Sequence, residues 1–175
     1  MKKNIEQTLE TAVLYHKKGN FQDAEQLYRS ILESNPLHPD TNHNLGVLAV
    51  SFNKIDKAIP LFEVAIKSNP NKQQFWLSYI DALIKNKDLA LANKVIEEAE
   101  KNRIFKSEHF QLFFNLALRH QELGKLEEAK ESYNKAIDLQ PNYAQAHNNL
   151  GIVLQRMSKL EEAKESYNKA IDLQP

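Results

Sequence analysis

The chain has 175 residues, with 23 Lys and Arg against 23 Asp and Glu, and it contains no cysteine. A formal net charge of zero argues against a nucleic-acid partner and against an anionic membrane surface, since both call for a surplus of Lys and Arg. The missing thiols exclude disulfides, zinc sites built from Cys and cysteine nucleophiles.

We expect no secretory signal at the N-terminus. Lys2 and Lys3 are not followed by the apolar stretch that a secretory signal needs. The longest apolar run, residues 45–50, is far too short to cross a bilayer. We therefore expect a soluble, cytoplasmic protein with no membrane contact.

The chain repeats itself every 34 residues. Residues 159–175 copy residues 125–141 without a change, at an offset of 34. Two pairs of glycines and two pairs of prolines are separated by 105 residues, which is three periods and three further residues. An insertion of three residues therefore lies between Pro70 and Phe110. The pairs are Gly19 with Gly124, Gly46 with Gly151, Pro36 with Pro141, and Pro70 with Pro175.

Five repeats fit this period, and small residues recur at two of their positions. The repeats are residues 5–38, 39–72, 73–106, 110–143 and 144–175, with the insertion at 107–109. Two antiparallel helices approach closely only where side chains are small, so these positions predict where the helices of each repeat cross. The eighth residues are Ala12, Gly46, Ile80, Ala117 and Gly151, and the twentieth are Ala24, Ala58, Ala92, Ala129 and Ala163.

A period of 34 with this pattern resembles the tetratricopeptide repeat family, in which each repeat is a helix–turn–helix unit. The resemblance covers nearly the whole chain. It implies an all-α fold, a right-handed α-solenoid of five repeats that forms a single domain over residues 1–175.

Three local features complete the prediction, in chain order. Pro60 is expected in the first turn of its helix, where a missing N–H costs nothing. The third repeat departs most from the pattern, with Lys87 at a turn that favours glycine and Ile104 in place of proline, so we expect a longer loop around residues 102–109. Ser158 followed by Glu161 predicts a capping box that begins the last helix.

The sequence gives no support for catalysis. No two of the six histidines lie three or four residues apart, so one helix face cannot chelate a metal with them. There is no Gly-x-Ser-x-Gly motif, and four glycines cannot supply a phosphate-binding loop. His120 and His147 take core-like positions. We expect no enzyme, no cofactor and no metal.

The family resemblance implies that the first helix of each repeat lines a concave groove. By this resemblance, residues 2, 5, 6, 9, 12 and 13 of a repeat would point into the groove, although the same side chains could instead pack on neighbouring first helices. We single out the fifth and ninth positions first. The candidates of this kind are Val47, Leu77, Phe114, Leu118, Asn148 and Ile152.

Asparagine recurs at the sixth position, as Asn44, Asn115 and Asn149. This resembles the asparagine ladder in the superhelix of O-linked N-acetylglucosamine transferases. An amide both donates to and accepts from a peptide backbone, so the ladder would bind polypeptides with little sequence preference. The alternative is a family habit without binding, and Glu10 and Ser78 interrupt the series.

The prediction for function is a protein–protein interaction scaffold that binds a protein or peptide ligand. The alternative is an accessory substrate-recognition region of a larger glycosyltransferase, sulfotransferase or methyltransferase. The fifth repeat copies the interior fourth, so Tyr167, Ala170 and Ile171 are suited to contact a further helix. We therefore also expect self-association through the C-terminal repeat.

Overall fold

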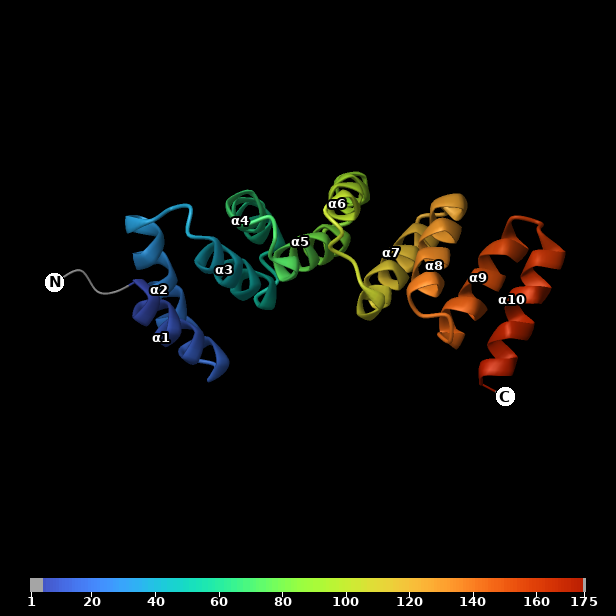
Figure 1. Cartoon of the computed structure of the whole chain (residues 1–175), viewed down its shortest axis with the longest axis horizontal. Coiled ribbons are helices and arrows are strands. Elements are labelled where there is room, and N and C mark those ends of the chain that lie inside the picture. The colour runs from blue at the N-terminus through green and yellow to red at the C-terminus, as the bar shows by residue number, and fades with distance from the viewer. Residues whose placement is uncertain (1–4, 175) are drawn as a thin grey trace. The chain divides into compact units, whose positions relative to one another are not determined.

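The computed structural model describes residues 5–174, which form ten α-helices, one short 3-10 helix and no strand (Figure 1). The predicted all-α fold is confirmed. Lys2, Lys3 and Pro175 lie outside the described residues. The elements are α1 (Ile5–Lys17), α2 (Phe21–Ser34), α3 (Pro39–Ser51), α4 (Ile55–Ser68), α5 (Gln73–Lys85), α6 (Leu89–Lys101), η1 (Ser107–His109), α7 (Phe110–Glu122), α8 (Leu126–Leu139), α9 (Ala144–Arg156) and α10 (Leu160–Leu173).

The helices pair as the repeats predict, and they group into two compact units. The N-terminal unit ends at Ile104 and contains α1 to α6, and the C-terminal unit begins at Phe105 and contains η1 and α7 to α10. Within each unit, consecutive helices of one repeat pack against each other (Figure 1). The division falls where the third repeat loses its proline. A single continuous solenoid over both units stays a prediction.

The small residues lie where two helices cross, as expected. A Cβ atom added to Gly46 would stand 2.6 Å from a ring carbon of Phe62, and one added to Gly151 would stand 2.6 Å from a ring carbon of Tyr167. Ala58 and Ala129 at the twentieth position are completely buried. The backbones therefore approach to a distance that leaves room only for small side chains.

The turn inside each repeat needs a left-handed residue. The fifteenth residue has a positive φ in all five repeats, and glycine occupies only two of these positions. The predicted capping box is therefore wrong: Ser158 closes α9, while Lys159 is the N-cap of α10 and makes no side-chain cap hydrogen bond. The φ values are 81° at Gly19, 56° at Asn53, 61° at Lys87, 72° at Gly124 and 62° at Ser158.

Replacing Lys87 by glycine should stabilise the N-terminal unit. A side chain with a Cβ in the left-handed region costs about 1–2 kcal/mol, and glycine adopts that region freely at some loss of chain entropy. We expect a net gain of about 0.5–1 kcal/mol in the free energy of unfolding. Urea unfolding followed by the fluorescence of Trp76 measures it. Gly124→Lys is the reverse change in the C-terminal unit, and stabilisation by that variant would contradict the argument.

In three repeats, the side chain at the fourth position contacts a proline carbonyl of the preceding turn. Trp76 Nε1 donates to the carbonyl of Pro70 at 2.7 Å, and Asn42 Nδ2 donates to the carbonyl of Pro36 at 2.9 Å. His147 Nε2 lies 2.9 Å from the carbonyl of Pro141, so this residue has a polar role beyond filling the core.

The insertion is more ordered than a plain loop. Residues 107–109 form the 3-10 helix η1, and the Lys106 N–H donates to His109 Nδ1 at 2.8 Å. The ring of Phe105 packs edge-on against Phe113, with 4.8 Å between centroids. The irregular segment is thus shorter than expected and covers residues 102–106.

Pro60 lies inside its helix, which corrects the prediction. Since α4 begins at Ile55, Pro60 is its sixth residue and stands in the second turn. An amide at that position would donate to the carbonyl of Asp56, four residues earlier. Proline therefore removes one helical hydrogen bond.

Candidate functional site

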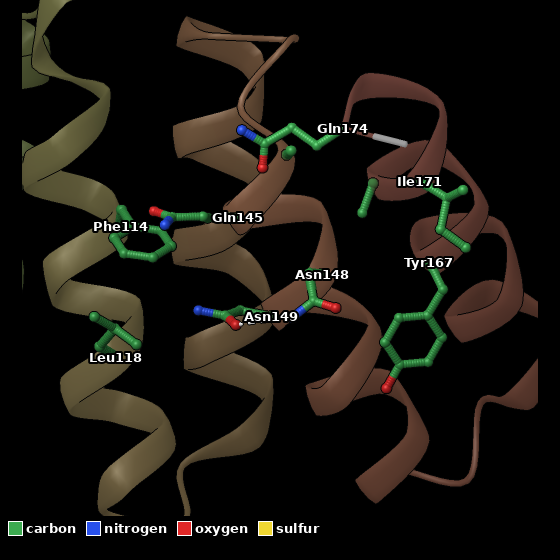
Figure 2. A pocket seen from close by; sticks show the side chains of 10 residues that line it. Phe114, Leu118, Gln145, Asn148, Asn149, Tyr167, Ile171 and Gln174 are labelled. Atoms are coloured by element: carbon green, nitrogen blue, oxygen red, sulfur yellow. Dashed lines mark hydrogen bonds between the residues drawn. The ribbon is translucent and has the colours of Figure 1, made fainter.

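The C-terminal unit contains a groove between two first helices and the last helix. Its volume is about 780 Å³, and its walls come from α7, α9 and α10. Figure 2 shows Phe114 and Leu118 on one side, Tyr167 and Ile171 on the other, and Asn149 between them. The lining residues are Phe114, Leu118, Ala144, Gln145, Asn148, Asn149, Tyr167, Ala170, Ile171 and Gln174.

The lining of this groove combines apolar side chains with amides and carries no charged side chain. Six lining residues are apolar or aromatic, and the other four are amides. Apolar surface favours contact with apolar side chains, and amides can donate to and accept from a peptide backbone.

A second hollow of about 420 Å³, in the N-terminal unit, has a more charged lining than the groove. Its lining includes five charged residues, Glu25, Arg29, Lys54, Asp56 and Lys57.

The predicted site residues fall into three groups. Phe114, Leu118, Asn148 and Asn149 come together in the groove. Asn115 on α7 and Ile152 on α9 are half-buried and are not among its lining residues. The others lie half-buried on the first helices of the N-terminal unit, and they are Asn44, Val47 and Leu77.

Two lining amides, Gln145 and Gln174, were not among the predicted site residues. Gln145 is the second residue of the fifth repeat, a position that also faces the groove in the family, so its signal was present. Gln174 lies just beyond α10 and no repeat position marks it. Tyr167, Ala170 and Ile171 were expected to contact a further helix, and they form one wall of the groove.

The sixth-position asparagines all have partners within the chain. The Asn149 amide donates to the hydroxyl of Tyr133, whose pKa burial raises to about 12. Asn115 Oδ1 accepts from Gln111 Nε2 at 3.2 Å, and Asn44 Oδ1 lies 3.3 Å from His43 Nδ1. These contacts favour a structural role for the sixth position. The exposed amides of the groove are those of Gln145, Asn148 and Gln174. Gln145 Oε1 accepts from the Tyr143 hydroxyl at 2.9 Å and Asn148 Nδ2 donates to Asn149 Oδ1 at 3.4 Å, so exposure and not the lack of a partner distinguishes them.

Residues at the twelfth position, also expected to face the groove, bind within their own repeats. Gln121 accepts from the Tyr133 hydroxyl at 2.8 Å, and Gln155 accepts from the Tyr167 hydroxyl at 3.0 Å. In the N-terminal unit, the fifth-position His43 bonds to Ser78 on the next first helix, with 2.9 Å between Nε2 and Oγ. Part of the expected groove face therefore serves packing.

Models of one known repeat family match most of this chain. Tetratricopeptide repeat models match residues 10–40, 43–106 and 144–175, and a TPR repeat model matches residues 117–158. The chain belongs to the tetratricopeptide repeat family. No curated protein matches it.

Solved tetratricopeptide structures share the fold. A MamA protein superposes with a TM-score of 0.83 at 18% identity, over 99% of this chain and 93% of that one. MamA 41-end from Desulfovibrio magneticus RS-1 gives 0.77 at 20% identity, over 97% and 94%. YrrB, described as a TPR protein with an unusual peptide-binding site, gives 0.76 at 22% identity, over 96% and 85%.

The histidines of this tetratricopeptide protein are packed side chains. Burial lowers the pKa of His16, His43, His109 and His120. Within residues 5–174, no three His, Asp or Glu side chains gather as a metal site would require. None of the helices in that range is long and apolar enough to cross a membrane.

His120 has a buried nitrogen without a partner. The side chain is 2% exposed, Nδ1 lies 3.2 Å from Ser132 Oγ, and Nε2 has no hydrogen-bond partner. A buried polar atom without a partner costs about 1–3 kcal/mol. Leu83 and Leu154 occupy the same position in the third and fifth repeats, so leucine fits there.

His120→Leu should therefore stabilise the C-terminal unit by about 1 kcal/mol at pH 7. Because burial lowers the pKa of His120 below 6.5, the unfolded chain binds more protons below that pH. The stability contributed by the neutral ring is present above pH 6.5 and is lost as the pH falls. The advantage of the variant should thus grow from pH 7 to pH 5, in urea unfolding followed by circular dichroism. Equal pH slopes for both proteins would refute the argument.

Proposed function

We propose that this protein is a scaffold that holds a polypeptide partner in the groove of its C-terminal unit. The observation that carries the proposal is the groove lining, which combines apolar side chains with amides and has no charge. The known peptide-binding site of YrrB, a protein with the same fold, supports a polypeptide as ligand.

The chemistry of the lining defines the partner segment. Phe114, Leu118 and Ile171 offer apolar surface on both walls, so the segment should present apolar side chains to both. Gln145 and Asn148 are exposed amides that can pair with the N–H and C=O groups of a partner backbone. A charged segment would lose water without gaining a counter-charge, so the segment in the groove should be uncharged.

We extend the proposal to the first helices of the N-terminal unit. Asn44 and Val47 on α3 and Leu77 on α5 are half-buried, and they repeat the positions of Asn149, Ile152 and Asn148. In the C-terminal unit, Asn115 lies on α7 and Ile152 on α9, the two first helices that line the groove. Each unit would then contact its own segment of the partner through its first helices.

Peptides selected from a random library on the immobilised chain test the proposal. They should be rich in apolar residues and poor in charge where they contact the groove. Leu118→Asp should weaken their binding about tenfold or more, because it places a charge on the apolar wall. Leu14→Asp on the exposed side of α1 is the matched control and should bind normally.

The dependence of peptide affinity on salt concentration distinguishes this uncharged groove from a charged binding site. Binding should change by less than about twofold between 50 and 500 mM NaCl, since no charge pairs are formed in the groove. A steep loss of affinity with salt would contradict the proposal. So would a peptide set that binds equally to the Leu118→Asp variant.

A further inference from the structure

Two helices of identical sequence lie in different surroundings in the C-terminal unit. α8 and α10 both read LEEAKESYNKAIDL, and both follow a first helix of their own repeat. α8 is also covered by α9, the first helix of the next repeat. α10 has no such helix in the described residues. The difference between the two copies therefore reveals the surface that a following helix covers.

That surface is one stripe along the helix. Its four residues stand at spacings of four, three and four, which places them on one side. In α8 none of them is exposed, and Tyr133 is completely buried. The same four residues of α10 form what we call the α10 stripe. There Leu160 is 65% exposed and Ile171 is 60% exposed. The stripe is Leu126, Lys130, Tyr133 and Ile137 in α8, and Leu160, Lys164, Tyr167 and Ile171 in α10.

The chain also shows what kind of helix covers such a stripe. In α9 the third, seventh and tenth residues of the repeat are Ala146, Leu150 and Val153, and all three are buried. The same positions of α3 are buried under the preceding α2, as Thr41, Leu45 and Leu48. In α1, which no described helix precedes, they are exposed. This face therefore packs on the preceding helix.

We propose that the α10 stripe binds a helix of another protein in the way that α8 binds α9. The partner helix would carry a small residue, a leucine and a β-branched residue at i, i+4 and i+7. An asparagine before the leucine could donate to the Tyr167 hydroxyl, as Asn149 donates to Tyr133. The inference rests on the proposed function, since Tyr167 and Ile171 also form a wall of the groove.

A second copy of the chain offers no free first helix with this pattern. Its α9 is already packed within its own unit. Its α1 presents Gln7, Thr11 and Leu14, and the Thr11 hydroxyl donates to the Gln7 carbonyl at 2.9 Å. Two of these three residues are polar, as terminal repeats of helical arrays commonly are on the outside. The stripe therefore fits a foreign helix better than a copy of α1.

A peptide with the sequence of residues 142–158 is the probe, because it reproduces α9. A hydrocarbon staple between positions 148 and 155, both exposed in α9, keeps it helical so that folding does not limit binding. The full chain is titrated with the labelled peptide by fluorescence anisotropy. Ile171→Asp should weaken saturable binding about tenfold or more. Lys169→Gln, which changes the net charge equally on the opposite side of α10, should leave it unchanged.

Three results would overturn the inference. One is the absence of saturable binding by the stapled peptide, and another is equal binding by the Ile171→Asp variant or by a peptide with Leu150→Asp and Val153→Asp. The third is a dimer in sedimentation that Ile171→Asp dissolves, which would make a second copy the occupant. None of these affects library peptides that depend on Leu118, so the proposed function is judged separately.

Discussion

Gly46→Val should destabilise the N-terminal unit by about 3 kcal/mol, the upper range for an overpacked core. A Cβ at this position would stand 2.6 Å from the Phe62 ring, and Phe62 is 1% exposed. The ring has no open space to enter, so either the two helices separate or the ring leaves its rotamer. Both responses lose packing across the crossing of α3 and α4.

Gly151→Val is the matched control because its clash has the same length. A Cβ there meets the Tyr167 ring at 2.6 Å, but Tyr167 is only half-buried and borders the groove. Its ring can turn toward the open side, so we expect a loss of about 1 kcal/mol. Urea unfolding measures both, with Trp76 fluorescence for the first and circular dichroism for the second. Equal losses would show that the open face gives no relief.

Pro60→Ala should stabilise the N-terminal unit by about 2–3 kcal/mol. Proline inside a helix removes one backbone hydrogen bond and its ring crowds the carbonyl four residues earlier. Pro60 is exposed, so alanine leaves no cavity. The variant restores a donor to the carbonyl of Asp56 and adds the best helix former. The midpoint of urea unfolding by Trp76 fluorescence should rise clearly.

A second variant separates the hydrogen bond from helix propensity. Pro60→Gly also restores the donor, but glycine is about 1 kcal/mol less favourable than alanine in a helix. It should therefore give a smaller gain than Pro60→Ala. A loss of stability in both variants would mean that Pro60 serves the N-terminal unit through its packing in the hollow beside Lys57 and Leu61.

The fold was largely predictable because the length of the repeat and its small residues determine how the helices pair. A period of 34 with small residues at two positions fixes helix pairs and their crossings, and Gly46 and Gly151 lie at those crossings. Local motifs were less reliable. Ser158 resembled a helix N-cap, yet it is itself the left-handed residue of the turn between α9 and α10. Pro60 was predicted in the first turn of its helix and lies in the second, because a sequence pattern places a boundary such as the start of α4 only within a few residues.

The site was predictable in part, for a different reason. Phe114, Leu118, Asn148 and Asn149 follow from repeat positions, because those positions fix the side of the helix. The role of each amide depends on its neighbours, which no spacing reveals. Asn149 bonds to Tyr133, whereas Asn148 beside it is exposed. The contribution of α10 depends on Tyr167 and Ile171 being uncovered, and α8 has the same residues covered.

The most direct test of the proposed groove is a map of peptide contacts by NMR. The chain, labelled with ¹⁵N, is titrated with one library-selected peptide, and the side-chain NH₂ signals of asparagine and glutamine are followed. The groove predicts that the signals of Gln145, Asn148 and Gln174 shift with a common affinity, and that Leu118→Asp abolishes these shifts. Shifts confined to the charged hollow around Arg29 and Lys57, with Gln145 and Asn148 unmoved, would contradict it.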